Sequence, residues 1–367
     1  MKVLHLVQKP QLRGAEIFTS QLSYHINQNG HKASIAFLFP GNSELPFKTT
    51  SYHLNGKIKR RFNDLKAWKR LAEIIKEEKP DIIQANAGDT LKYAVFSKLF
   101  FRWEQPIVFR NASTISLYIK KGWSKKWNGF FFKYADKIIS VSKASATDFA
   151  TLFPQYKHKI TTIPIGIEQD AISNQQFESQ RLLADVSTKP NLVHVGGFTH
   201  EKNHVGLLSI FESVLKSLPH AQLHLVGDGP LRKEIETLVH KKNLQSNVLF
   251  HGFQKNAMQF IKQANVLLLP SLIEGLPGVI LESFFCKTPV VAYNVGGIQE
   301  VLIPETTGYL VEKGNEQKFV NAVFEALQQN DRNKQFIDKA YQLVTSQYLN
   351  TQIAKQFLSV YESVIAA

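Results

Sequence analysis

The sequence predicts an α/β protein with two doubly wound domains, each built on a parallel sheet that helices cover on both faces. Its 367 residues are too many for one ordinary hydrophobic core, which favours two domains. Short apolar runs alternate with stretches of helical period, an order typical of parallel sheets. A polar segment at 168–190 separates two sets of these runs. We therefore expect one domain at 1–170 and another at 185–345, with a ligand cleft between the carboxyl ends of their strands.

The first domain is expected to begin with a strand followed by an amphipathic helix. In this helix Ile17, Leu22 and Ile26 recur on one face, and Gly30 is a suitable stop. Further apolar runs of strand length follow at intervals. The expected strands are 2–7, 33–38, 81–85, 106–110, 137–141 and 160–163.

The second domain repeats the alternation of strand and helix. The last segment, 351–367, places Ile353, Phe357, Val360 and Val364 on one side of a helix. The expected strands are 191–197, 221–229, 247–252, 265–271, 289–297 and 308–311.

A short loop from Glu274 to Pro277 connects an apolar strand to a helix. Pro277 fits the first turn of that helix, where its missing amide hydrogen is not needed. This order places Glu274 at the carboxyl end of the strand. The free backbone amides of Gly278 and Val279, at the start of the helix, then form a site for an anion.

Glu282 follows Gly278 by four positions and so lies on the same helix face, one turn further on. Its neighbours in sequence are apolar, and a buried carboxylate is costly unless hydroxyl or amide groups donate hydrogen bonds to it. The hydroxyls of a ribose would meet this need, as they do at the acidic residue of dinucleotide sites. The alternative is a surface glutamate on an amphipathic helix.

Each domain has a glycine turn before a helix that fits a phosphate. In the second domain a strand ends in Gly196 and Gly197, and Lys202 adds a cation at the mouth of the next helix. In the first domain Gly14 opens a helix whose first turn contains Glu16. Both features also have structural interpretations, because an exposed lysine is commonly just solvated and the helix dipole favours an early acidic residue. The two helix N-termini could still converge on one diphosphate.

The positive charge of the chain is confined to its first half. Residues 1–170 contain 27 of the 44 Lys and Arg residues and 13 of the 30 Asp and Glu residues, so they carry the whole net charge of +14. This domain is therefore expected to bind an anionic partner. The chain has one cysteine, Cys286, and no apolar stretch of about 20 residues, which predicts a cytoplasmic protein without disulfides or membrane-spanning helices.

Two clusters at 57–70 and 119–137 hold much of this charge, and the second mixes lysines with Trp123 and Trp127. Such a mixture suits an anionic membrane surface. Part of the second cluster should belong to the core, because it runs directly into a strand. Nucleic-acid binding would explain the charge equally well but gives the acidic residues of the loop and helix no purpose. We therefore expect the first domain to receive a lipid-linked or otherwise anionic glycan acceptor at an anionic membrane surface, and to bind no nucleic acid.

The second half resembles retaining glycosyltransferases of family 4, the glycosyl transferases group 1 type, in the ordered segments "VGGFTHEKNH", "LHLVGDGPLRKEIETL", "VLFHGF", "VLLLPSLIEGLPGVILES" and "PVVAYNVGGIQEVLIPETTGYLV". The first half is similar to their acceptor-side domain in "RGAE", "NGHKASI", "PDIIQA", "ADKIISVSKAS" and "ITTIPIGIE". The resemblance implies a GT-B fold of two Rossmann-like domains, with a C-terminal helix at 350–367 that crosses back to the first. It also implies transfer of a sugar from a nucleotide donor with retention of configuration and no required metal or other cofactor.

The resemblance further implies roles for individual residues. Glu274 would contact hydroxyls of the transferred sugar and support the transition state, and Lys202 would bind the diphosphate. Glu282 would hold the ribose. The other implied donor-binding residues are Gly14, Gly197, Phe253, Leu276, Gly278 and Val279. Backbone amides and a cation of this kind would stabilise the charge of a diphosphate leaving group.

The chain departs from the family pattern at three positions. Gly197 stands where the family commonly has an arginine, and Arg13, where the family often has a glycine, is a candidate replacement for that cation. Asn86 stands where the family often has a histidine near the transferred sugar, and its amide is able to hydrogen-bond a hydroxyl.

The expected function is transfer to a glycan or lipid-linked acceptor in cell-surface polysaccharide synthesis, in the cytoplasm or at the inner face of the membrane. The same nucleotide-sugar site would also serve an epimerase or a hydrolase. A dehydrogenase is excluded because no G-x-G-x-x-G follows the first strand.

Overall fold

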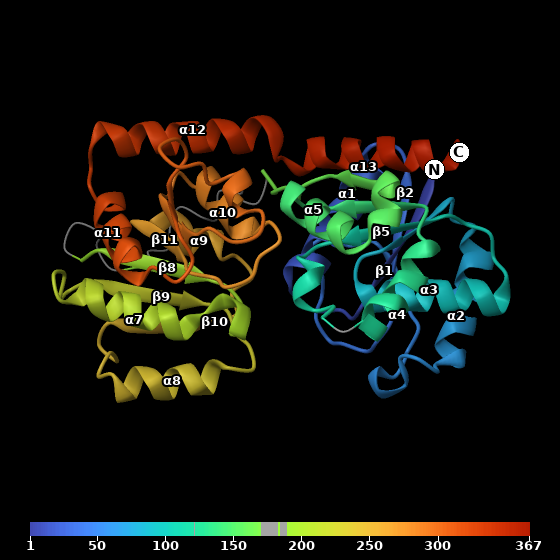
Figure 1. Cartoon of the computed structure of the whole chain (residues 1–367), viewed down its shortest axis with the longest axis horizontal. Helices are drawn as coiled ribbons and strands as arrows, with labels where there is room; N and C mark the ends of the chain where they lie inside the picture. Colours follow the sequence, from blue (N-terminus) through green and yellow to red (C-terminus); the bar gives the residue numbers. More distant parts are fainter. Residues whose placement is uncertain (121, 170–182, 184–188) are drawn as a thin grey trace. The chain divides into compact units, whose positions relative to one another are not determined.

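A computed structural model shows the chain as two compact units (Figure 1). One unit consists of Met1–Glu168 together with Asn350–Ala367, and the other of Gln169–Leu349. The expected linker at 168–190 lies mostly outside the described residues. The structure describes residues 1–120, 122–169, 183 and 189–367.

The sheet of the first unit is parallel, with its described strands in the order β3-β2-β1-β4-β5-β6-β7. The strand order reverses between β1 and β4, which makes the sheet doubly wound. The edge strand β3 is an addition to the expected set, since its residues are largely exposed and form no apolar run. The strands are β1 (Lys2–Val7), β2 (Lys32–Phe37), β3 (Thr50–His53), β4 (Ile82–Ala85), β5 (Ile107–Asn111), β6 (Lys137–Ser140) and β7 (Ile160–Thr162).

Helices cover both faces of this sheet. On one face α1 and α13 pack together, with the ring centroids of Phe18 and Phe357 5.8 Å apart. The other face carries α2 to α5. The helices are α1 (Gly14–Gln28), α2 (Leu65–Glu78), α3 (Gly88–Phe101), α4 (Gly122–Lys133), α5 (Lys143–Leu152) and α13 (Asn350–Ile365), with short 3-10 turns η1 (Ile58–Arg60), η2 (Ile115–Leu117) and η3 (Pro154–Lys159).

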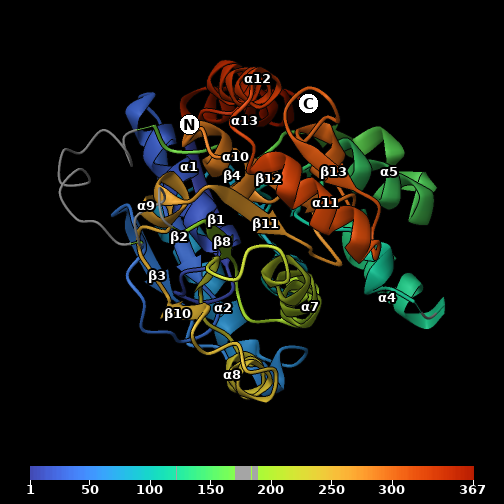
Figure 2. The same cartoon turned by 90° about the vertical axis from the view of Figure 1, so that its left-hand side faces the viewer.

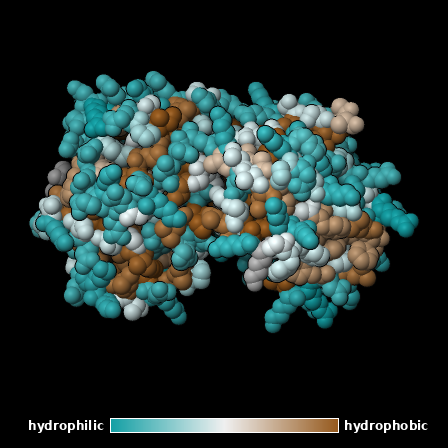
Figure 3. All heavy atoms as spheres, in the orientation of Figure 1, coloured by the Kyte–Doolittle hydropathy of each residue, from teal (hydrophilic) through white to brown (hydrophobic). Residues whose placement is uncertain are grey.

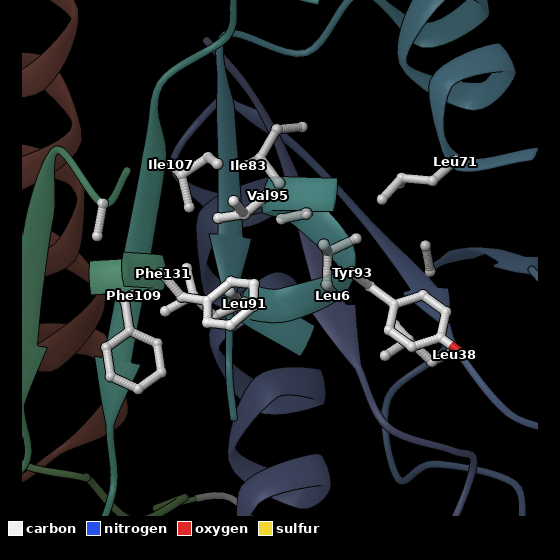
Figure 4. Packing of buried hydrophobic residues seen from close by; sticks show 14 of the residues in the cluster. Leu6, Leu38, Leu71, Ile83, Leu91, Tyr93, Val95, Ile107, Phe109 and Phe131 are labelled. Atoms are coloured by element: carbon white, nitrogen blue, oxygen red, sulfur yellow. The ribbon is translucent and has the colours of Figure 1, made fainter. Parts of the chain in front are cut away.

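The larger core of the first unit lies between the sheet and helices α2 to α5 (Figure 4). Leu6, Ile83 and Ile107 come from three neighbouring strands, and Leu91 and Phe131 come from helices. Strands buried on both faces are apolar along their length, and each fully buried side chain of this size stabilises the fold by about 1.5–3 kcal/mol.

The basic and aromatic segment at 119–137 forms α4 and leads into β6. Phe131 and Phe132 enter the core, whereas Trp123 is 69% exposed and Trp127 40% exposed. Part of the segment is therefore core, as the sequence predicts, and part is surface.

The sheet of the second unit is also parallel, in the order β10-β9-β8-β11-β12-β13, so β11 lies between β8 and β12 (Figure 2). Helices α7, α8 and α11 share one core, and α10 packs against α9 and α12 instead. The prediction of two doubly wound parallel sheets is confirmed. The strands are β8 (Asn191–Val195), β9 (Gln222–Val226), β10 (Val248–Gly252), β11 (Val266–Leu269), β12 (Val290–Tyr293) and β13 (Tyr309–Val311). The helices are η5 (His200–Lys202), α7 (His204–Leu215), α8 (Arg232–Lys241), α9 (Met258–Gln263), α10 (Gly278–Phe285), η6 (Ile298–Glu300), α11 (Glu316–Ala326) and α12 (Asp331–Gln347).

Across the described ranges, none of the helices has both the length and the apolar composition that crossing a membrane requires.

Candidate functional site

The loops that follow β8 and β11 meet at the carboxyl edge of the second unit's sheet, where its strand order reverses. Ligands of doubly wound sheets bind at this edge. The amide of Leu272 donates a hydrogen bond to the carbonyl oxygen of Glu201 over 2.7 Å, and Nδ2 of Asn203 donates to the carbonyl oxygen of Pro270 over 3.0 Å. These bonds hold the two loops together.

The same loops bring Lys202 and Glu274 into contact. Nζ of Lys202 lies 2.6 Å from Oε1 of Glu274, and the two side chains are 22% and 10% exposed. The structure thus joins Glu274, which the resemblance places at the transferred sugar, to Lys202, which it places at the diphosphate. Because the lysine ammonium has three donors on a flexible stem, it is able to bind an anion beside the carboxylate.

Two glycines outside the predicted site let the loops after β12 and β9 approach the site loops after β11 and β8 closely. Gly296 has a φ of +56°, and a Cβ there would lie 2.0 Å from the carbonyl oxygen of Glu274. Gly227 has a φ of +142°, and a Cβ there would lie 2.0 Å from the carbonyl oxygen of Gly196. Only glycine fits both requirements. The glycine pairs just after β9 and β12 are the sequence signal for them.

Helix α10 begins beside Glu274 with an open N-terminus. Pro277 precedes it in an extended conformation and supplies no side-chain cap. The amides of Gly278 and Val279 therefore have no partner within the helix and form an anion site. Leu276 is 7% exposed, so its side chain is buried in the protein.

Glu282 lies one turn along α10 and is partly exposed. Burial of its carboxyl raises the pKa to about 7. Within the described part of the chain, no side chain or amide donates a hydrogen bond to this carboxyl. A carboxyl whose pKa burial raises, and which has no donor within the described protein, fits the hypothesis of a hydroxyl-binding residue better than that of a fully solvated surface glutamate.

Two histidines lie next to Lys202 and were missed by the sequence analysis. His194 Nδ1 lies 2.8 Å from the carbonyl oxygen of Leu268, and the His204 ring stacks on Phe198 at 4.1 Å. Burial, followed by the charge of Lys202, lowers the pKa of His204 to about 4, and burial lowers that of His194 well below its ordinary value. Both rings are therefore neutral near pH 7 and add no positive charge beside the ammonium of Lys202. Isolated histidines in strand and helix carry no sequence signal for this placement.

The other donor-binding candidates of the second unit lie on nearby loops. Gly197 follows β8, and a Cβ there would be 3.6 Å from the carbonyl oxygen of Asp228, so the backbone has room for a side chain. Phe253 follows β10 and is 44% exposed. Its roles, like those of the residues above, stay predictions.

In the first unit, Arg13 and Gly14 stand at the start of α1. Arg13 precedes the helix without capping it, and a Cβ at Gly14 would meet nothing within 4 Å, so the approach to the helix amides is open. Asn86 follows β4 and is 3% exposed. Its amide donates to the carbonyl oxygen of Leu6 over 3.2 Å and accepts from Nε2 of Gln84 over 2.9 Å. These groups are engaged within the protein, and a contact from Asn86 to a sugar stays a prediction.

Two protein-family models match the chain. The one described as Glycosyltransferase Family 4 matches residues 12–171, and the one described as Glycosyl transferases group 1 matches residues 175–343. The chain belongs to this glycosyltransferase family.

Several family members are similar to this chain in sequence. An uncharacterized glycosyltransferase of Methanocaldococcus jannaschii is 29% identical over 259 residues, which are 66% of this chain and 63% of that protein. The N-acetylgalactosamine-N,N'-diacetylbacillosaminyl-diphospho-undecaprenol 4-alpha-N-acetylgalactosaminyltransferase of Campylobacter jejuni is 24% identical over 253 residues, which are 67% of each chain. This chain therefore spans about two thirds of the length of either relative.

The fold of the family is also present in solved structures. HepE of Anabaena, in complex with UDP and glucose, has a TM-score of 0.84 and 18% sequence identity, over 99% of this chain and 100% of that one. This likeness confirms the GT-B fold that the resemblance implies.

Proposed function

We propose that the chain is a retaining glycosyltransferase that moves a sugar from a nucleotide-diphosphate sugar to a glycan or lipid-linked acceptor, in cell-surface polysaccharide synthesis on the cytoplasmic side. The observation that carries the proposal is the carboxyl of Glu282, whose pKa burial raises and for which the described part of the chain supplies no donor, beside the open N-terminus of α10. Family membership and the UDP and glucose of the HepE structure support a nucleotide-sugar donor.

In this proposal the donor is bound at both of its ends. The diphosphate accepts hydrogen bonds from the amides of Gly278 and Val279 and from Nζ of Lys202. Its ribose hydroxyls donate to Glu282, and the exposed ring of Phe253 lies against the base. Glu274 accepts hydrogen bonds from the transferred sugar.

The chemistry follows from where charge develops. As the bond between the sugar and the diphosphate breaks, negative charge gathers on the leaving oxygen. Preorganised amides and a lysine stabilise that charge, and one such donor is commonly worth about 10²–10³ in kcat. We propose that the transfer needs no metal, since Lys202 and α10 supply the positive partners. Full activity in excess EDTA, with no gain from added magnesium or manganese, is the expected result.

For the acceptor side we propose a lipid surface. Phe62 and Trp127 touch with ring centroids 6.1 Å apart, which joins α4 to the segment before α2. Figure 3 shows hydrophobic residues gathered over α2 to α4 with hydrophilic residues among them. The basic aromatic patch, as we call it, consists of exposed Lys57, Ile58, Lys59, Arg60, Arg61, Phe62, Leu65, Lys66, Phe100, Trp123, Lys125, Lys126, Trp127 and Phe130. Tryptophans and lysines together bind anionic headgroups, and the diphospho-undecaprenol named for the Campylobacter relative supports a lipid-linked acceptor.

A thermal-shift panel with UDP, GDP, ADP and their sugars tests the donor site. One nucleotide is expected to raise the melting temperature of the wild type and to lose most of this effect in Glu282→Gln. Glu312→Gln, at an exposed position after β13, is the matched control and should respond like the wild type. No response to any nucleotide, or an equal response in Glu282→Gln, would contradict the proposal. Anomeric configuration of the product, read by NMR, tests retention.

A further inference from the structure

Glu274 pairs with the same cation that the proposed donor site offers to a diphosphate. Nζ of Lys202 lies 2.6 Å from Oε1 of Glu274, and the two side chains are 22% and 10% exposed. Within the ranges that the structure describes, Lys202 is the one group that donates a hydrogen bond to this carboxylate. An anion that binds to Lys202 therefore has to compete with Glu274.

The backbones that carry the pair are fixed, whereas the lysine head is not. The amide of Leu272 donates to the carbonyl oxygen of Glu201 over 2.7 Å, which joins the two loops beside both partners. The stem of Lys202 passes over Gly196, where a Cβ would lie 3.3 Å from its Cδ. A change of partner at Nζ therefore needs only rotations within the long side chain of the lysine.

A nucleotide sugar and a nucleoside diphosphate differ in what they offer this pair. The nucleotide sugar supplies phosphate oxygens to Lys202 and sugar hydroxyls to Glu274, so both partners are satisfied after the exchange. The nucleoside diphosphate supplies only the phosphate, and its terminal phosphate carries a further negative charge. It draws the cation away from Glu274 and leaves a partly buried carboxylate beside a like charge, which is unfavourable.

We propose that Glu274 is a specificity-determining residue that weakens the binding of the product nucleoside diphosphate by competing for Lys202. This inference rests on the proposed function and adds release of the product to it. The sugar of the donor removes the competition while it is attached, and its transfer to the acceptor restores the competition. Discrimination of this kind combines a contact for one ligand with an unfavourable contact for the other.

Isothermal titration of the full chain tests the competition. The probes are UDP, GDP, ADP and inorganic pyrophosphate, the last of which needs no recognition of a base. Glu274→Gln is expected to bind pyrophosphate, and the one nucleotide that the site accepts, at least about tenfold more tightly than the wild type, because the amide no longer holds the lysine.

Glu201→Gln is the matched control. It removes the same charge from the residue next to Lys202, but its carboxylate is hydrogen-bonded to its own amide and to the side chain of Thr199. Its affinity for the same probes should stay within about twofold of the wild type, as expected for a charge that forms no close pair with the lysine.

A double-mutant cycle with Lys202→Met separates competition for the lysine from simple repulsion of the diphosphate by Glu274. If the two anions compete, Glu274→Gln gains less than about twofold in affinity when Lys202 is already methionine, because no cation is left to release. Repulsion alone would give the same gain in both backgrounds.

Glu274→Asp keeps the test open if Glu274→Gln misfolds. The shorter side chain retains the charge and withdraws the carboxylate from Nζ of Lys202. Competition predicts tighter binding of pyrophosphate by this variant, with a smaller gain than that of Glu274→Gln, whereas repulsion predicts no gain.

Equal affinity of the wild type and Glu274→Gln for a nucleotide that both bind would overturn this inference and leave the proposed transferase standing. An equal gain with and without Lys202 would also overturn it. Failure of both proteins to bind any of the nucleotides would refute the donor site itself, and the inference with it.

Discussion

Glu168 accepts hydrogen bonds from both His25 and Asn350 at the point where the chain leaves and re-enters the first unit. Its Oε1 lies 2.9 Å from Nε2 of His25 and 2.5 Å from Nδ2 of Asn350, and all three residues are buried. This contact ties α1, the end of the first segment and the start of α13 into one body.

Replacing Glu168 with alanine is expected to lower the free energy of unfolding of the first unit by about 3–5 kcal/mol, because it leaves buried donors without their acceptor. All four tryptophans, Trp68, Trp103, Trp123 and Trp127, belong to this unit, so urea unfolding followed by tryptophan fluorescence reports on it alone. Glu77→Ala, which removes an exposed pair with Arg70, should cost less than about 1 kcal/mol. Equal effects of the two variants would show that the contact is dispensable.

Nucleotide binding should weaken at acid pH through Glu282. Burial raises the pKa of this carboxyl to about 7, and the proposed ribose contact uses the ionised form. Below pH 7 the affinity is therefore expected to fall about tenfold per pH unit. Isothermal titration should show this slope in the wild type and its loss in Glu282→Gln, whose affinity at pH 8 is lower by about 10- to 100-fold. Protonation of the nucleotide itself affects both proteins alike.

The same carboxyl should destabilise the free protein at high pH. Its pKa in the folded chain exceeds the ordinary value of 4.5, so the folded state binds the proton more tightly, and stability falls as the pH rises from about 4.5 to 7. Glu282→Gln imitates the protonated form. It is expected to raise the free energy of unfolding by about 2–3 kcal/mol at pH 8 and to change it little at pH 4. Calorimetry of the unfolding of the second unit measures the change at each pH. A variant less stable than the wild type at pH 8 would refute the argument that burial raises the pKa of Glu282.

Lys202→Ala is expected to lower kcat by about 10²–10³, because it removes a cation from the leaving diphosphate and leaves Glu274 uncompensated. The KM for the donor should change less than kcat, since the charge develops mainly in the transition state. Lys313→Ala, at an exposed position beyond β13, is the control. An unchanged kcat in Lys202→Ala would remove this lysine from the mechanism.

Binding to anionic vesicles should depend on the basic aromatic patch. Replacing both Lys125 and Lys126 with glutamate is expected to weaken flotation with anionic liposomes at low salt by at least about 30-fold, since each lysine near a charged membrane contributes about 1 kcal/mol. The double variant Lys233→Glu, Lys241→Glu on α8 carries the same charge change outside the patch and should float like the wild type. Absence of wild-type protein from the vesicle fraction would count against a membrane partner altogether.

The fold and the second unit's loops could be predicted because their signals are local. An apolar strand, a glycine or proline turn and a helix follow one another within about twenty residues around Glu274 and around Gly197. The contact between Lys202 and Glu274 joins two such loops, and it becomes predictable once β8 and β11 are known to be neighbours.

The features that sequence reasoning missed depend on register between distant strands. Arg110 is one residue of an apolar strand, and only the packing of the folded chain shows that its Nε and Nη1 are buried without an acceptor. The placement of His194 and His204 beside Lys202 likewise depends on burial and ring contacts that form only in the folded chain. The edge strand β3 is exposed and has no apolar run, so the sequence does not predict its pairing with β2.

The return of α13 to α1 has a consequence for biosynthesis. A ribosome releases residues 169–349 before Phe357 and Tyr361, both of which are fully buried against the first sheet. The first unit begins synthesis first but is completed last, because it needs α13. Until α13 is made, the first unit exposes an apolar face of its sheet, whereas the second unit already has all of its residues. The protein therefore has most need of a chaperone while its first unit still lacks α13.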